Sequence, residues 1–171
     1  MALTQDYFEL FGLAPCYRID AKALEEAFRR VSLQVHPDRF AGASPAMQRV
    51  AEQWSARANE AHAVLASPLK RAAYLCERAG APLEAEKNTR MPVDFLMQQM
   101  GWREALESGA GDRSRLEALR DEVAGEGRAL IEAIGEALDD EKSPQKAVPL
   151  VRKLMFIEKM AGEVSAALEK I

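Results

Sequence analysis

The feature that most constrains the fold is a repeat of apolar residues every three or four positions along most of the 171-residue chain. This spacing places the apolar residues on one face of an α-helix. Two long stretches in the first half show it, with apolar stripes that read Leu24, Phe28, Val31, Val35 and then Val50, Trp54, Ala58, Ala61, Leu65. Only 6% of the residues are aromatic, so the composition also favours helices over strands. We therefore predict an all-α protein.

Capping residues and prolines predict where the helices of the first half begin and end. Asp20 and Ser44 are good N-caps for the two long helices. Pro37 ends the first of them, because the residue before a proline is pushed out of the α region. Shorter helices are predicted over 6–13 and 69–80, each next to a glycine that can stop it.

The second half shows three more helical patterns, which predict a C-terminal three-helix bundle over 92–171. They cover roughly 92–107, 112–139 and 149–171. Before them, residues 81–91 show no sustained period, and we interpret the stretch 76–91 as a linker or crossover.

Glycines and a proline predict irregularities in the last two helices. Gly125, Gly127 and Gly135 each cost up to about 1 kcal/mol relative to Ala inside a helix, so a kink or break is expected there. Pro149 cannot donate an intrahelical hydrogen bond, so the main body of the last helix is predicted to start near Val148.

Composition and charge narrow the classes of partner. The net charge is −4, so no general basic field attracts nucleic acid or an anionic membrane, although residues 1–75 carry nine Lys and Arg against eight Asp and Glu. Cys16 and Cys76 stand alone and match no paired zinc or redox motif. No stretch reaches the ~20 apolar residues of a membrane span, and the first residues have no basic leader. We expect a cytoplasmic monomer with free thiols and no metal or cofactor.

Three residues, His36, Pro37 and Asp38, occupy the bend between the two long helices. On spacing alone they are a turn, with Pro as the helix breaker and Asp as the turn former. An enzyme in which Asp38 orients His36 as a general base lacks an evident nucleophile, metal set or phosphate loop in the sequence. A metal site that adds His62 is disfavoured too, because His62 lies within a helical pattern that looks structural.

Two helices of the second half carry apolar residues on more than one face. At 100° per residue, Phe95, Trp102 and Leu106 share a stripe, and Leu96, Met97 and Met100 lie roughly 100° to 200° away from it. Either the linker or the N-terminal half covers the second face, or it contacts another protein. Phe156 lies about 110° from the core stripe of the last helix, as a flank of that stripe or as a surface contact.

The first 75 residues resemble a J domain, the ATPase-stimulating module of DnaJ-class co-chaperones. The resemblance rests on DYFELFGL at 6–13, VHPDRF at 35–40 and NEAHAVLASPLKRAAYL at 59–75. It implies that the triad His36, Pro37 and Asp38 faces an ATP-bound heat-shock chaperone, and that a basic helical face docks on an acidic surface of that chaperone. By position this face holds Arg29 and Arg30, with Arg39 beside the triad. Gln34 and Val35 replace the Lys-Tyr common before the triad, so we expect a less basic dock and a narrower choice of partner.

Over nearly its whole length the chain resembles the HscB family, J-type co-chaperones of iron-sulfur cluster assembly, in its bacterial form. The matching segments are YFELFGL at 7–13, LKRAAYL at 69–75, FLMQQM at 95–100, WREALE at 102–107 and VRKLMFIEKM at 151–160. The Gly/Phe-rich stretch and CxxCxGxG repeats of a general DnaJ do not occur. The resemblance implies a scaffold-binding face for IscU made by Leu96, Met97, Met100, Glu104 and Phe156. Gly101 stands where relatives can carry an acidic residue, so one polar contact is expected to be missing.

The resemblance implies a function without covalent chemistry by the chain itself. The C-terminal bundle would capture IscU, and the J domain over 1–75 would present it to the heat-shock ATPase HscA and stimulate ATP hydrolysis. The alternative is a specialised J-domain adaptor that delivers a different client to a DnaK-class chaperone.

Overall fold

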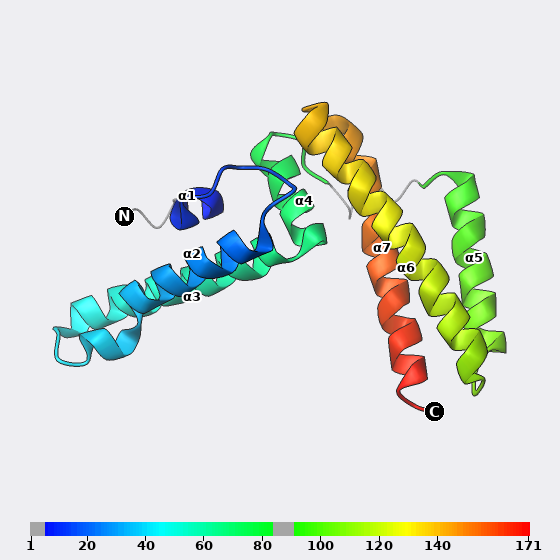
Figure 1. Ribbon diagram of the computed structural model, residues 1–171, viewed down its shortest axis with the longest axis horizontal. Coiled ribbons are helices and arrows are strands. Elements are labelled where there is room, and N and C mark those ends of the chain that lie inside the picture. Colours follow the sequence, from blue (N-terminus) through cyan, green and yellow to red (C-terminus); the bar gives the residue numbers. More distant parts are fainter. Residues whose placement is uncertain (1–5, 84–90) are drawn as a thin grey trace. The chain divides into compact units, whose positions relative to one another are not determined.

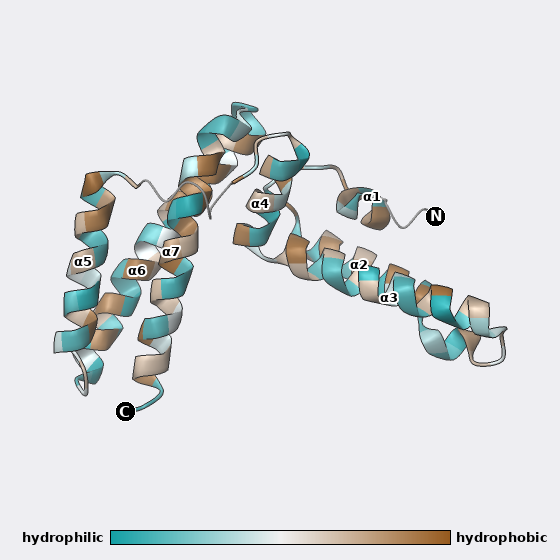
Figure 2. Cartoon of the chain, turned by 180° about the vertical axis from the view of Figure 1, so that it is seen from behind, coloured by the Kyte–Doolittle hydropathy of each residue, from teal (hydrophilic) through white to brown (hydrophobic). Residues whose placement is uncertain are grey.

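The computed structural model describes residues 6–83 and 91–171, and every regular element in these two ranges is a helix. This confirms the prediction of an all-α protein. The chain divides into two compact units, Met1–Leu75 and Cys76–Ile171, which are described separately. Hydrophilic and hydrophobic residues alternate along the helices, as expected of amphipathic helices that bury one face (Figure 2).

The first unit is built on a hairpin of two long helices, α2 (Ala21–Val35) and α3 (Pro45–Ala66), which lie side by side (Figure 1). The Asp20 side chain accepts hydrogen bonds from two backbone N–H groups at the start of α2, and the Ser44 side chain caps α3 in the same way. Both predicted N-caps are therefore confirmed. A one-turn 3₁₀ helix, η1 (Pro37–Phe40), forms the first part of the connection.

A short helix, α1 (Tyr7–Phe11), closes the core of this unit against the hairpin. Asp6 caps its start, and Gly12 ends it in the left-handed region at φ 68°. The phenol of Tyr74, in α4 (Pro68–Arg78), donates a hydrogen bond of 3.0 Å to the Asp6 carboxylate and accepts one of 3.1 Å from the Tyr7 N–H. The Tyr7 and Tyr74 rings stack at 4.6 Å, so sequence segments almost seventy residues apart hold each other in place.

The second unit packs α5 (Val93–Ser108), α6 (Arg113–Gly135) and α7 (Pro144–Leu168) side by side (Figure 1). Its core contains the predicted stripe residues Phe95 and Trp102 together with residues of the other two helices, namely Leu119, Val123, Ile157, Met160 and Val164. The indole N–H of Trp102 donates to Glu122 of α6 at 2.8 Å. These contacts leave the other sides of α5 available to solvent.

The kink predicted at the glycines of α6 is wrong for two of the three positions. The helix continues through Gly125 and Gly127, and only at Gly135 does it give way to a five-residue π-helix, η2 (Glu136–Asp140). A Cβ at Gly127 would lie 3.3 Å from the Ile157 side chain, so this glycine lets α6 approach α7 closely. The extensive packing of α6 on α7 outweighs the weak helix propensity of glycine.

The predicted start of the last helix near Val148 is also wrong. Helix α7 begins at Pro144, and the N–H groups of Lys146 and Ala147 bond to the Ser143 carbonyl. Pro149 then lies in the second turn, where it removes one hydrogen bond, and the complete burial of Ala147 and Val151 holds this turn in the helix.

The segment interpreted as a linker, 76–91, is only partly covered by the structure. Residues 76–78 form the end of α4, and residues 84–90 lie outside the described ranges. The guanidinium of Arg152, in α7, donates through Nε to the Leu83 carbonyl at 2.7 Å, so the start of the crossover is attached to the second unit. None of the helices in the described ranges is long and apolar enough to cross a membrane.

Candidate protein-docking sites

The loop after α2 has a conformation that follows from its sequence. His36 precedes a proline and adopts φ −60° and ψ 128°, outside the helical region, so α2 ends at Val35 as predicted. Pro37 then begins η1, where its fixed φ and missing N–H are tolerated. The three residues of the triad are exposed on this connection at the end of the hairpin.

Hydrogen bonds within the loop orient the triad. The backbone N–H of Asp38 donates to Nδ1 of His36 at 3.3 Å. Because Nδ1 accepts this bond, we assign the proton of the neutral ring to Nε2, which can donate to a partner. Arg39 donates to the carbonyl of Leu33 at 3.0 Å and so attaches the loop to the last turn of α2. The Asp38 carboxylate lies 3.5 Å from Nδ1 of His36 and is 90% exposed.

The basic pair on α2 divides into two roles. Arg29 is exposed and can meet an acidic surface directly. Arg30 donates from Nη2 to the Phe11 carbonyl at 3.3 Å, so it also attaches the end of α1 to α2. The sequence predicted both as docking residues, and the structure adds a structural contact for Arg30.

His62 makes interhelical contacts of a structural kind. Its Nε2 lies 2.6 Å from the Glu25 carboxylate, and its ring stacks on Phe28 at 4.2 Å. These contacts join α3 to α2. In the two described ranges, no group of three or more His, Cys, Asp or Glu side chains is arranged to hold a metal ion.

Helix α5 has the two apolar faces that the sequence predicted. Phe95 and Trp102 are buried in the bundle, whereas Leu96, Met97 and Met100 expose 43%, 68% and 71% of their surface. Glu104 is exposed one turn beyond Met100. The second face of this helix is therefore an open apolar surface on the second unit.

Phe156 lies on α7 within a stretch that contacts α5 at both ends. Lys153 Nζ lies 5.2 Å from the centre of the Phe95 ring, and Arg103 pairs with Glu163 at 3.5 Å. The contact nearer the start of α5 is also nearer the start of α7, so the two helices run parallel. Phe156 is three residues after Lys153 and is 41% exposed, so it belongs to the solvent-facing part of α7.

A shallow hollow of about 540 Å³ extends this surface toward the end of α5. Met97, Met100, Gly101 and Glu104 line it with two further residues that the sequence analysis did not select, Arg103 and Glu107. A Cβ at Gly101 would meet no atom within 4 Å, so this position is open to a side chain.

Met155, 39% exposed next to Phe156, was missed as well. Its angular offset of about 100° from Leu154 on a helical wheel was a signal that could have shown it.

The comparisons agree with this architecture over the whole chain. A family model described as the HSCB C-terminal oligomerisation domain matches residues 91–165. A co-chaperone protein HscB homolog of Bordetella petrii is 51% identical over 162 residues, which are 95% of each chain. Its counterpart in Burkholderia multivorans is 47% identical over 173 residues, covering 100% of this chain and 98% of the relative.

Two solved structures are also similar. Chaperone HscB from Vibrio cholerae is 32% identical with a TM-score of 0.85, covering 97% of this chain and 99% of its own. The human co-chaperone protein HscB has a TM-score of 0.90 at 23% identity, covering 100% of this chain and 85% of its own, and shows the shared fold.

Proposed function

The chain belongs to the HscB family of co-chaperones, and from this premise we propose that it delivers the scaffold protein IscU to the heat-shock ATPase HscA and stimulates ATP hydrolysis by HscA. The observation that supports the proposal is that each of the two units exposes the side chains expected to dock a protein. One holds the triad and the basic residues of α2, and the other holds the apolar face of α5 with Phe156.

The first surface is the proposed HscA dock. His36, Pro37 and Asp38 are exposed, and the loop that holds them is ordered by its own hydrogen bonds, so little conformational entropy is lost on docking. Arg29, Arg30 and Arg39 supply the positive charge that attracts an acidic surface and raises the rate of association.

The second surface is the proposed IscU dock. Leu96, Met97, Met100 and Phe156 present apolar area that burial against a partner would remove from water, and the methionines can adapt to its shape. Glu104 borders this area and can pair with a cation of the scaffold. The description of the matching family model names oligomerisation, and we assign this capacity to a complex with IscU formed by a chain that is a monomer on its own.

Tethering explains how a chain without covalent chemistry of its own accelerates delivery. Holding client and chaperone on one molecule raises the effective concentration of one for the other. Docking of the triad favours the chaperone state that hydrolyses ATP, and this is a coupling between binding sites. We place this cycle in the cytoplasm.

Steady-state ATP hydrolysis by purified HscA tests the proposal. The rate is measured alone, with this protein, and with this protein plus IscU, and each condition is repeated with His36→Gln. We expect the wild-type protein and IscU together to stimulate hydrolysis synergistically. We expect His36→Gln to give no stimulation, with or without IscU. Stimulation without any effect of IscU would favour another client, and no stimulation at all would leave the triad an ordinary turn.

A further inference from the structure

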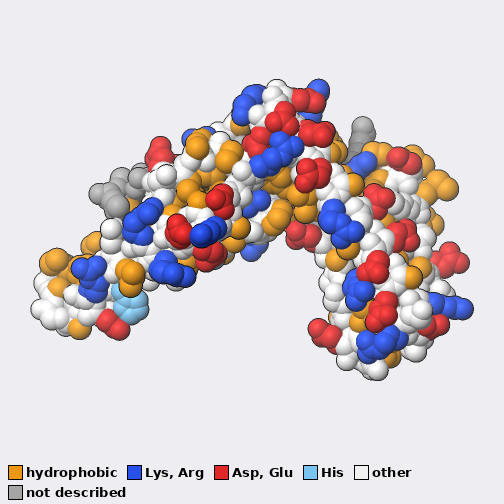
Figure 3. All heavy atoms as spheres, in the orientation of Figure 1, with side chains coloured by type: hydrophobic (Ala, Val, Ile, Leu, Met, Phe, Trp, Pro, Cys, Tyr) orange, Lys and Arg blue, Asp and Glu red, His pale blue; other side chains and the backbone are white. Residues whose placement is uncertain are grey.

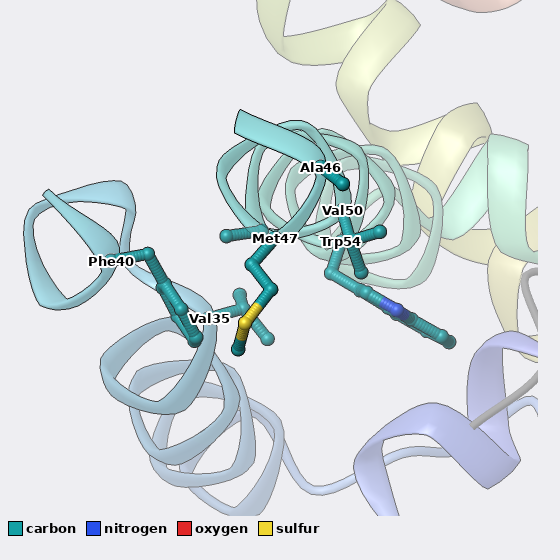
Figure 4. A pocket seen from close by; sticks show the side chains of 7 residues that line it. Val35, Phe40, Ala46, Met47, Val50 and Trp54 are labelled. Carbon is teal, nitrogen blue, oxygen red and sulfur yellow. The ribbon is translucent and has the colours of Figure 1, made fainter. Parts of the chain in front are cut away.

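An apolar groove lies at the tip of the α2–α3 hairpin, beside the triad. Its volume is about 250 Å³. Figure 4 shows α3 side chains on one side of the opening and those of Val35 and Phe40 on the other. The groove, called the tip groove below, is lined by Val35, Phe40, Ala46, Met47, Val50, Ala51 and Trp54.

The tip groove is an uncovered continuation of the core of the first unit. The apolar stripe of α3 predicted Val50 as a core residue, but Val50 is 51% exposed, whereas Trp54, one turn further on, is 8% exposed. The reason is the length of α1, whose five residues pack against the hairpin from Trp54 onward and not at its tip. Met47, one turn before Val50, is 54% exposed. A hollow lined by apolar side chains in this way can receive an apolar side chain of a partner.

The position of the tip groove ties it to the triad. Val35 is the residue before His36, and Phe40 is the second residue after Asp38, so the triad and one wall of the groove belong to one continuous turn of chain. A partner surface that touches the triad therefore meets the same turn of chain that forms this wall of the groove. Figure 3 shows hydrophobic and basic side chains and a histidine together at the end of the hairpin.

Charge indicates the kind of partner. From Arg29 to Ala51 the chain carries four arginines and a single acidic residue, Asp38. A second copy of the chain would bring four more arginines to the same place, which like-charge repulsion disfavours. An acidic surface suits this end of the hairpin.

We propose that the tip groove receives a large apolar side chain from the acidic surface of the ATPase chaperone that docks on the triad. This inference rests on the proposed function, and it adds an apolar anchor to a contact otherwise made of charges and the triad. The arginines set the rate of encounter, and the anchor slows dissociation.

A double variant, Met47→Ser with Val50→Ser, tests the anchor. Both side chains are exposed, so the variant is expected to unfold at the same temperature as the wild type. The dissociation constant for HscA is measured at several salt concentrations, with Val93→Ser as a matched control that removes an exposed valine from α5.

We expect binding about tenfold weaker at every salt concentration, with faster dissociation and an unchanged slope of affinity against salt. Saturating amounts of the variant should still stimulate hydrolysis, because the triad is intact. Val93→Ser should bind as the wild type does.

Three results would overturn the inference while leaving the proposed function in place. They are unchanged binding by the double variant, a loss confined to low salt, and a concentration-dependent dimer of the wild type that the double variant cannot form. If the wild type itself neither binds nor stimulates HscA, the proposed function fails and the anchor fails with it.

Discussion

The two units present their proposed docking surfaces on different kinds of structure. In the first unit the surface centres on a loop whose shape is set by neighbouring residues, because Pro37 ends α2 and His36 accepts the Asp38 N–H. In the second unit it is a face of a regular helix, left open because Phe95 and Trp102 turn the other face into the core. A loop motif acts through a few groups in a defined geometry, whereas an open helix face acts through buried area.

Because the two surfaces lie on separate units, we predict that a substitution in one surface leaves binding at the other unchanged. The loss of IscU binding is the largest effect we expect. A triple variant that changes Leu96, Met97 and Phe156 to Ala should weaken IscU binding a hundredfold or more. Each substitution removes roughly 1.5 kcal/mol or more of apolar contact that the complex would bury. Titration calorimetry measures the affinity. Stimulation of HscA by this variant without IscU should match the wild type, and His36→Gln should bind IscU normally. Unchanged IscU binding would show that the assigned face is wrong.

The two cysteines, one in each unit, differ in burial and therefore in the expected reactivity of their thiols. Burial raises the pKa of the Cys76 thiol from 9.0 to about 11, so the thiolate that reacts with iodoacetamide is scarce at pH 8. Cys16 is partly exposed. We expect Cys16 to be alkylated faster than Cys76, because Cys76 is buried and the pKa of its thiol is raised, as followed by peptide mass spectrometry.

The same pKa shift gives the sign of a pH effect on stability. The folded protein holds the Cys76 proton more tightly than the unfolded chain, so this contribution is complete below pH 9 and is lost as the pH rises toward 11. Equal alkylation rates for Cys16 and Cys76 at pH 8 would contradict the closed packing around Cys76.

The two arginines of α2, Arg29 and Arg30, are both expected to contribute to docking, but only Arg30 is expected to contribute to the stability of the first unit. Arg30→Ala should lower the free energy of unfolding by about 1 kcal/mol, because the Phe11 carbonyl loses its donor, whereas Arg29→Ala should leave it unchanged. Urea unfolding measures both. Each variant should also weaken HscA binding at low salt and flatten its salt dependence. Equal stabilities of the two variants would show that the contact to Phe11 contributes nothing.

The smallest expected effects come from replacing two glycines of the second unit, one on an open face and one between packed helices. Gly101→Ala should raise the free energy of unfolding by about 0.5 to 1 kcal/mol, since its Cβ meets no atom within 4 Å and alanine favours the helix. Gly127→Ala should raise the free energy of unfolding by less than Gly101→Ala does, or lower it, because its Cβ would lie 3.3 Å from the Ile157 side chain. Thermal unfolding compares them, and an equal gain at both would argue against close packing of α6 on α7.

Much of the fold could be predicted from local sequence. Apolar periodicity identified each long helix, and the N-caps Asp20 and Ser44 and the stop at Gly12 lie where they were expected. The placement of His36, Pro37 and Asp38 on an exposed bend followed from the proline alone. These features depend on backbone geometry and hydrogen bonds within a few residues, so the sequence contains the information that determines them.

Other features depend on what packs against a helix, and the sequence does not state that directly. The glycines of α6 and Pro149 of α7 disfavour a helix locally, but interhelical burial keeps both segments helical. Val50 shares the stripe of Trp54 yet lies in solvent, because α1 is too short to cover it. Periodicity determines which residues share a face of a helix, and only the tertiary structure decides whether another helix covers that face, because burial depends on the length and position of its neighbours.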